Sequence, residues 1–128
     1  MDQFNQAPAP TQDEFDTLNN SMTISNFAIT GGILPLYGTK LKTILFIRAL
    51  YISPSQAITA GATVTLGVLP VGSRPASTQY FGGVFTNASG TPFGFRAWIA
   101  TDGTISAVFE KAIATSASLF GTIPVILA

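Results

Sequence analysis

Short runs of alternating apolar and polar residues, separated by Gly, Pro, Asn and Asp, recur along most of the chain. Such alternation is typical of strands that bury one face, and the small polar residues between the runs favour turns. We predict eight strands, over residues 23–30, 33–41, 43–53, 59–69, 77–86, 93–101, 104–111 and 119–127. Short strands with a turn signal about every ten residues predict an all-β fold, an antiparallel β-sandwich or jelly roll.

The strand at 43–53 differs from the others because both of its faces are apolar. Such a strand lies between two layers, or between a core and a subunit interface. The residues of one face are Ile44, Phe46, Leu50 and Ile52, and those of the other are Leu45, Ile47, Ala49 and Tyr51.

The first 22 residues have a different pattern. Ala7 to Pro10 is stiff and extended because each proline fixes its own φ and restricts the residue before it. Thr11 to Glu14 then forms a capping box, the usual start of a helix. Phe15, Leu18 and Met22 follow at spacings of three and four, which places them on one face of a short helix. We predict an arm at residues 1–22 and a β-sandwich head domain at 23–128.

The helix predicted in the arm is too short to be stable alone in water. Its apolar face must therefore pack against the body of the same chain, against symmetry mates in a short bundle, or against a larger assembly. The arm would thus serve trimerisation or attachment.

Composition favours an oligomer. The chain has 128 residues, enough for one domain, with 47% hydrophobic and 9% charged residues, whereas about 25% charged is usual in soluble domains. Surface with so little charge is usually covered by another chain. The longest nearly apolar run, 44–52, contains Arg48 and is far shorter than the roughly 20 residues of a membrane-spanning helix. We therefore predict no membrane insertion.

Charge is segregated along the chain. Residues 1–22 contain four carboxylates and no basic residue, and residues 23–128 contain six basic residues against two carboxylates. The arm has a net charge of −4 and the body of +4. This split suggests that the arm has its own partner, either a basic surface elsewhere or the body of a neighbouring subunit. An acidic, solvated leader is the alternative.

The sequence contains few residues that could be catalytic. The chain has no histidine and no cysteine, which excludes the usual nucleophile systems and the commonest zinc sites. Of the two carboxylates in the body, Asp102 belongs to a turn signal, and Glu110 has no second carboxylate at a spacing suited to a glycosidase. Among the basic residues only Lys40 and Lys42 approach a cluster, which argues against nucleic acid binding. We predict a protein that is not an enzyme and needs no cofactor or metal.

Aromatic side chains are the candidates for binding. Flat rings beside a hydrogen-bonding side chain suit sugars, although most aromatic residues of a small domain belong to its core. Asp102-Gly103 predicts a two-residue type I′ turn, which would place Trp98 opposite Ala107 and Arg96 opposite Phe109. The candidate ligand-binding residues are Trp98, Arg96, Tyr80, Phe93 and Asn87, the last in the 87–91 loop, with Tyr37 as a further candidate ring.

A lone arginine stands at a rigid corner between two predicted strands. The nearest charged residues to Arg74 are Arg48 and Arg96. Pro70 and Pro75 reduce the freedom of the unfolded corner, and Gly72 permits a φ that other residues resist. A rigid corner aims the guanidinium, whose five donors suit backbone carbonyls at strand ends or at a subunit boundary. We favour this structural role over contact with a ligand.

The corner, with Leu69, Pro70, Gly72, Arg74 and Pro75, resembles the Leu-Pro-x-Gly-x-Arg-Pro segment of distal β-sandwich domains in bacteriophage and prophage tail proteins. These are receptor-binding and baseplate or tail fibre proteins. The likeness covers roughly residues 42–111. Its other parts are the Thr-Ala-Gly stretch at 59–61, the Pro-x-x-Thr strand at 75–78 and the Thr-Asp-Gly-Thr hairpin at 101–104.

The resemblance implies an antiparallel sandwich that assembles as a homotrimer and adheres to a saccharide or protein of the host surface. It also implies a place on the virion, with assembly in the bacterial cytoplasm and contact with other virion proteins through the arm. Receptor-binding proteins of this kind commonly have a long shaft, whereas only 22 residues precede the sandwich here. A capsid decoration or head-fibre protein is therefore the alternative.

Overall fold

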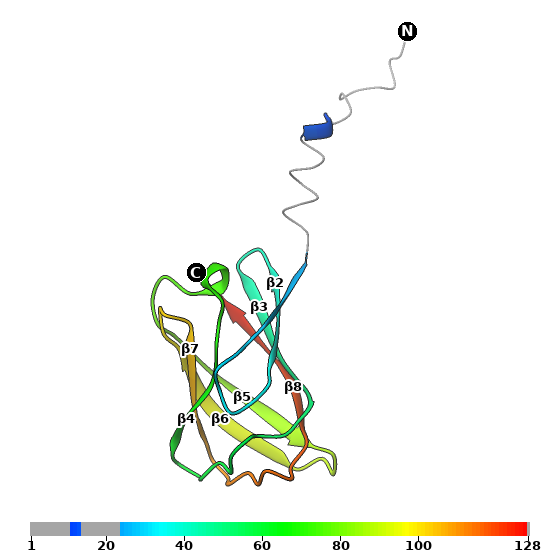
Figure 1. Ribbon diagram of the computed structural model, residues 1–128, viewed down its shortest axis with the longest axis vertical. Coiled ribbons are helices and arrows are strands. Elements are labelled where there is room, and N and C mark those ends of the chain that lie inside the picture. Colours follow the sequence, from blue (N-terminus) through cyan, green and yellow to red (C-terminus); the bar gives the residue numbers. More distant parts are fainter. Residues whose placement is uncertain (1–10, 14–23, 128) are drawn as a thin grey trace.

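Residues 24–127 form the body of the protein, in which eight β-strands are described, and all pairings between them are antiparallel (Figure 1). The computed structural model describes residues 11–13 and 24–127. The strands are β1 Ser25–Ala28, β2 Tyr37–Leu41, β3 Ile44–Ile52, β4 Thr63–Val68, β5 Gln79–Asn87, β6 Pro92–Ile99, β7 Thr104–Phe109 and β8 Leu119–Ile126, with a short 3₁₀ helix, η1, at Val71–Ser73. The predicted all-β, antiparallel fold class is confirmed.

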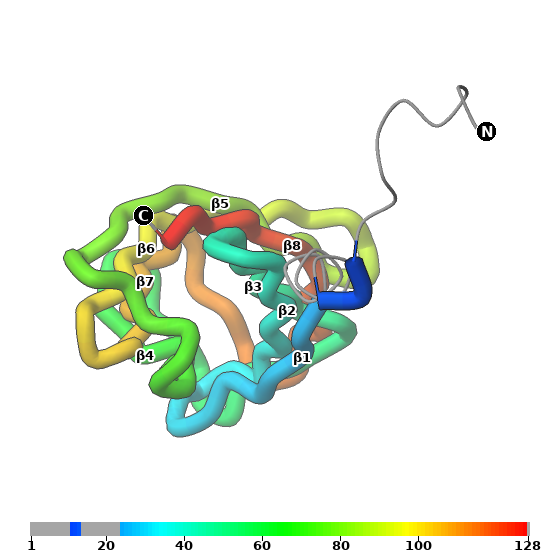
Figure 2. The backbone as a smooth tube through the Cα atoms, turned by 90° about the horizontal axis from the view of Figure 1, so that it is seen from above, coloured from blue at the N-terminus to red at the C-terminus, as the bar shows by residue number. Residues whose placement is uncertain are grey.

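The strands belong to one sheet in the order β1-β2-β3-β8-β5-β6-β7-β4. This sheet curls round, and a bridge between Thr30 and Val68 joins its two ends. Val68 N–H donates to the Thr30 carbonyl at 2.6 Å, and Thr30 N–H donates back at 3.3 Å. Figure 2 shows the strands running round a central interior. The two layers of the sandwich-like body, β1-β2-β3-β8 and β5-β6-β7-β4, are therefore parts of one continuous sheet.

The interior holds the side chains of every second strand residue. On β3, Leu45, Ile47 and Ala49 are at most 1% exposed. Three rings from the other layer, Phe85, Phe95 and Phe109, pack with centroids 4.9 to 6.3 Å apart. Burying an apolar side chain of this size contributes about 1.5 to 3 kcal/mol, so this core holds the two layers together.

The hairpin between β6 and β7 differs from its prediction by one residue. Ala100 N–H donates to the Thr104 carbonyl at 3.0 Å, so the loop has three residues rather than two. Gly103 has φ +89° and Asp102 has no positive φ, as in a tight turn followed by a glycine bulge. The expected partners of Trp98 and Arg96 are therefore wrong: Trp98 lies opposite Ser106, and Arg96 opposite Val108.

Two strands, β2 and β4, begin four residues later than predicted. The segment 33–36 bends and precedes β2, since Pro35 has no N–H to donate to a ladder. Residues 60–61 form a turn before β4, and Gly61 there has φ +78°. Such a φ is natural for glycine and interrupts a strand.

The arm remains a prediction. Gln12 and Asp13 are helical, whereas Phe15, Leu18 and Met22 lie outside the described residues. No helix in the described part of the chain is long and apolar enough to cross a membrane.

Candidate functional site

An aromatic pair lies on the outer surface of β5 and β6. Tyr80 and Trp98 are direct partners across the two strands, and Gly82 and Arg96 are the next outward-facing pair. The Tyr80 side chain is 78% exposed, and Trp98 is half-buried. Together they border an open groove of about 670 Å³, which is lined by Tyr80, Phe81, Gly82, Arg96, Ala97 and Trp98. We call this the Tyr80–Trp98 groove.

The absence of a side chain at Gly82 leaves the groove open at its centre. A Cβ at this position would meet only the carbonyl of Phe95 within 4 Å, at 3.6 Å, which is an ordinary contact. The φ of Gly82 is not positive, so the backbone does not require glycine here. The space over β5 therefore comes from the small residue itself.

Arg96 supplies the hydrogen-bonding group of the groove. It also borders a second hollow of about 380 Å³, lined by Gly61, Phe95, Arg96, Val108, Phe109 and Glu110. Within the described part of the chain, its exposed guanidinium has no hydrogen-bond or ion-pair partner. A flat guanidinium with free donors can hold a hydroxyl, carbonyl or anionic oxygen of a ligand beside the rings.

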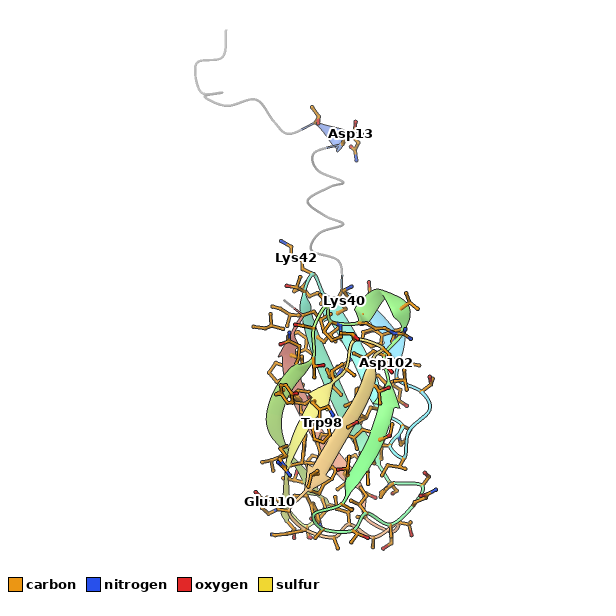
Figure 3. All side chains as sticks on the ribbon, turned by 90° about the vertical axis from the view of Figure 1, so that its left-hand side faces the viewer. Asp13, Lys40, Lys42, Trp98, Asp102 and Glu110 are labelled. Carbon is orange, nitrogen blue, oxygen red and sulfur yellow. The ribbon has the colours of Figure 1, made fainter. Side chains whose placement is uncertain are left out.

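A carboxylate lies along the same side of the body. Figure 3 shows Trp98 midway along this side and Glu110 at its lower end. A Cβ on Gly94 would lie 3.1 Å from the Glu110 carboxylate, so this side chain covers the outer surface of β6. The outer surface of the β5-β6-β7 layer therefore carries, one after another along its length, the rings of Tyr80 and Trp98, the guanidinium of Arg96 and the carboxylate of Glu110.

Two of the predicted ligand-binding residues lie elsewhere. Phe93 is 8% exposed and packs in the core, because its odd spacing from Arg96 places it on the other face of the sheet. Asn87 is at the opposite end of β5 from Tyr80. Its Oδ1 accepts hydrogen bonds from the N–H groups of Ser89 and Thr91, at 3.1 and 2.9 Å, and shapes their loop.

The groove therefore unites Tyr80, Arg96 and Trp98 from the predicted set. It adds Phe81, Gly82 and Ala97, which the sequence did not single out. Tyr37 lies on the other layer, opposite Arg48 in register. Among the described residues no group of acidic side chains could hold a metal ion.

The proline-rich corner is built around a backbone carbonyl. Arg74 Nε donates to the carbonyl of Leu69 at 3.0 Å, and the N–H of Leu69 donates to the carbonyl of Gly103 at 2.9 Å. Leu69 is fully buried. Pro70 precedes η1, its carbonyl accepts the N–H of Ser73 at 2.9 Å, and the corner ends at Pro75, which is buried. These bonds tie the corner to the β6–β7 hairpin.

The expectation for Gly72 is wrong. It has no positive φ, and a Cβ there would meet nothing within 4 Å. Its carbonyl instead accepts a hydrogen bond from Lys40 Nζ on β2, which links the corner to the opposite layer.

The carboxylate of Asp102 stabilises the turn beside this corner. Its Oδ1 accepts the N–H of Thr104 at 2.9 Å. Hydrogen bonds from the backbone and then the hydroxyl of Thr104, with a smaller contribution from the charge of Arg74, lower the pKa of Asp102 below its ordinary value.

Comparison with known proteins gives a structural likeness. No family model and no curated protein match the chain. Among solved structures, it is similar to the head domain of lactococcal phage bIL170, in a study of the receptor-binding domains of lactococcal phages, with a TM-score of 0.60 and 13% sequence identity. The match covers 83% of this chain and 100% of the other. This likeness shows a shared fold.

Proposed function

We propose that the chain is a non-enzymatic appendage of a bacteriophage virion, a homotrimer of the tail fibre or receptor-binding type that adheres to the host cell surface through the Tyr80–Trp98 groove. The observation that carries the proposal is the exposed Tyr80 beside Trp98 and Arg96, in an open groove. The fold shared with a phage receptor-binding head domain supports it.

The chemistry of the groove suits a saccharide. A sugar ring has an apolar face that stacks on an aromatic side chain, such as Tyr80, and a rim of hydroxyls that accept hydrogen bonds from a donor such as Arg96. The groove volume of about 670 Å³ lies in the range of about 300 to 1,000 Å³ of small-molecule sites. Single contacts of this kind are weak, and three equivalent grooves on a trimer would strengthen attachment by avidity.

The arm has a separate role in this proposal. Residues 1–22, through Phe15, Leu18 and Met22, attach the head domain to other virion proteins or join the copies of the trimer. The charge contrast between the arm and the body supports a specific partner for it.

A capsid decoration or head-fibre protein is the second candidate. In that case the aromatic residues would serve packing, and the burial of Phe93 and partial burial of Trp98 favour it. The 78% exposure of Tyr80 favours adhesion instead.

The location of the protein on intact virions separates the two candidates. Electron microscopy with an antibody against the head domain would place an adhesion protein at the tail tip and a decoration protein on the capsid. Because head fibres can also adhere, the purified protein should in addition be tested for binding to host cells, with Tyr80→Ala as the variant. Loss of binding by a folded variant supports the groove, and no binding of the wild type to any host envelope fraction overturns adhesion.

A further inference from the structure

The outer surface of the β1-β2-β3-β8 layer is strongly apolar. Tyr37, Leu50, Tyr51 and Ile126 are 51%, 55%, 73% and 62% exposed. Phe46 lies between them and is half-buried. We call these five residues the β3 face. Large exposed apolar patches on soluble proteins usually mark a contact with another molecule.

A bulge in β3 increases the apolar area of this face. The register of β3 with β8 shifts between Ala49 and Ile52, and Tyr51 has φ +53°. This conformation is unfavourable for a tyrosine. Its result is that Leu50 and Tyr51, although adjacent, are both exposed, with the Tyr51 ring 5.5 Å from that of Phe120 on β8. Bulges often change the direction of a side chain near a functional site.

Among the described residues, Arg48 is the only charged side chain at the outward positions of this layer. It is half-buried, and its Nη2 donates to Thr39 Oγ1 at 2.6 Å. Thr39 in turn donates to Asn26 Oδ1 at 3.0 Å. The Nε of Arg48 is buried without an acceptor among the described residues. The guanidinium is thus fixed in place, and part of its hydrogen-bonding capacity is unused.

The chain enters the body beside this face. β1 begins at Ser25, which pairs with Lys40 on β2, and Figure 1 shows β1 starting at the end of the body next to the β2–β3 turn. If three arms join the copies of a homotrimer, their points of entry lie near the threefold axis. The surface next to these points, β1-β2-β3, then faces the neighbouring copies.

From the entry point, the apolar surface and its near lack of charge, we infer that the β3 face is the surface through which copies of this chain pack against each other. This inference rests on the homotrimer of the proposed function. A ring of three copies brings different surfaces together, so Arg48 of one copy need not meet Arg48 of the next. The Tyr80–Trp98 groove, on the other layer, stays open to a ligand.

The test compares a charge on the β3 face with a matched charge on the other layer. Leu50→Asp and Val84→Asp introduce the same carboxylate at strand positions that are 55% and 52% exposed. Molar mass would be measured over a dilution series by light scattering. We expect Leu50→Asp to weaken trimer formation by roughly a hundredfold or more, and Val84→Asp to behave as the wild type. A Leu50→Asp trimer of unchanged stability would overturn the inference, as would equal loss in both variants.

Because the chain has no cysteine, a single thiol gives a second readout if Leu50→Asp fails to fold. The thiol of a Leu50→Cys variant should react slowly with a maleimide in the assembled protein and rapidly after dilution to the monomer. The thiol of Val84→Cys should react rapidly under both conditions. If the two thiols react at the same rate in the assembled protein, the β3 face is not the contact surface, although the trimer itself is not contradicted. A wild type that is monomeric at micromolar concentration contradicts the proposed trimer itself.

Discussion

Arg74 donates from its Nε to the carbonyl of Leu69 at 3.0 Å. The same residue, Leu69, also donates its N–H to Gly103, so one buried position connects the proline-rich corner and the β6–β7 hairpin. This explains why a single charge stands at the corner: a rigid backbone holds the guanidinium against a carbonyl at the end of β4. The hairpin fixed in this way carries Trp98.

Replacing Arg74 with Lys should reduce stability. Lysine keeps the charge but has no Nε in a planar fork, so the Leu69 carbonyl loses its donor. A hydrogen bond of this kind contributes about 1 kcal/mol, which chemical denaturation can measure. Arg96→Lys, at an exposed arginine, is the control and should unfold as the wild type. Equal stability of Arg74→Lys and wild type would show that the bond has no structural role.

Two glycines of this region should respond to alanine in opposite ways. Gly103 has φ +89°, and a Cβ there would lie 2.7 Å from the Leu69 carbonyl oxygen. We expect Gly103→Ala to cost about 2 kcal/mol or more. Gly72→Ala meets open space at an ordinary φ, so it should leave stability unchanged or raise it by up to about 1 kcal/mol. Thermal unfolding of both variants tests this contrast, and a similar loss in both would contradict it.

Asp102 should make stability depend on pH in the acid range. Its pKa is lowered in the folded state, chiefly by hydrogen bonds from Thr104. Its charge therefore stabilises the fold above the unfolded pKa of about 3.9, and this contribution is lost as the pH falls through the folded pKa. Melting temperatures of wild type and Asp102→Asn should differ near neutral pH and converge at low pH. A difference that is constant with pH would contradict this role.

Deletion of the arm tests whether the body folds by itself. A chain that begins at Thr23 retains every described strand, so we expect the same circular dichroism spectrum and cooperative unfolding. It should, however, fail to incorporate into virions. Loss of folding would show instead that Phe15, Leu18 and Met22 belong to the core of the body.

The sequence predicts the strands better than their partners. Alternation and turn residues identified all eight strands, because each signal is local. The one-residue error at Asp102-Gly103 arose because a two-residue and a three-residue loop share the same signal. Only the register reveals which side chains lie opposite Trp98, and that depends on the whole hairpin.

The candidate site was partly predictable. Trp98 and Arg96 share a face because they are two residues apart, and the same rule excludes Phe93. The pairing of Tyr80 with Trp98 and the space over Gly82 depend on the register of β5 with β6, which no local pattern specifies. Likewise, the two apolar faces of β3 indicate a second contact surface, but not the bulge that exposes Tyr51.

Filling the groove while keeping its aromatic residues tests the central claim most directly. Gly82→Val places a β-branched side chain, well suited to a strand, where a Cβ has only an ordinary contact. Thr63→Val, at an exposed position at the start of β4, adds apolar surface outside the groove. Binding of fluorescently labelled protein to cells of the host bacterium would be measured for both variants and the wild type, with circular dichroism as the check on folding. We expect Gly82→Val to be folded and to lose binding, and Thr63→Val to bind as the wild type; a folded Gly82→Val protein that binds host cells with unchanged affinity would contradict adhesion through the Tyr80–Trp98 groove.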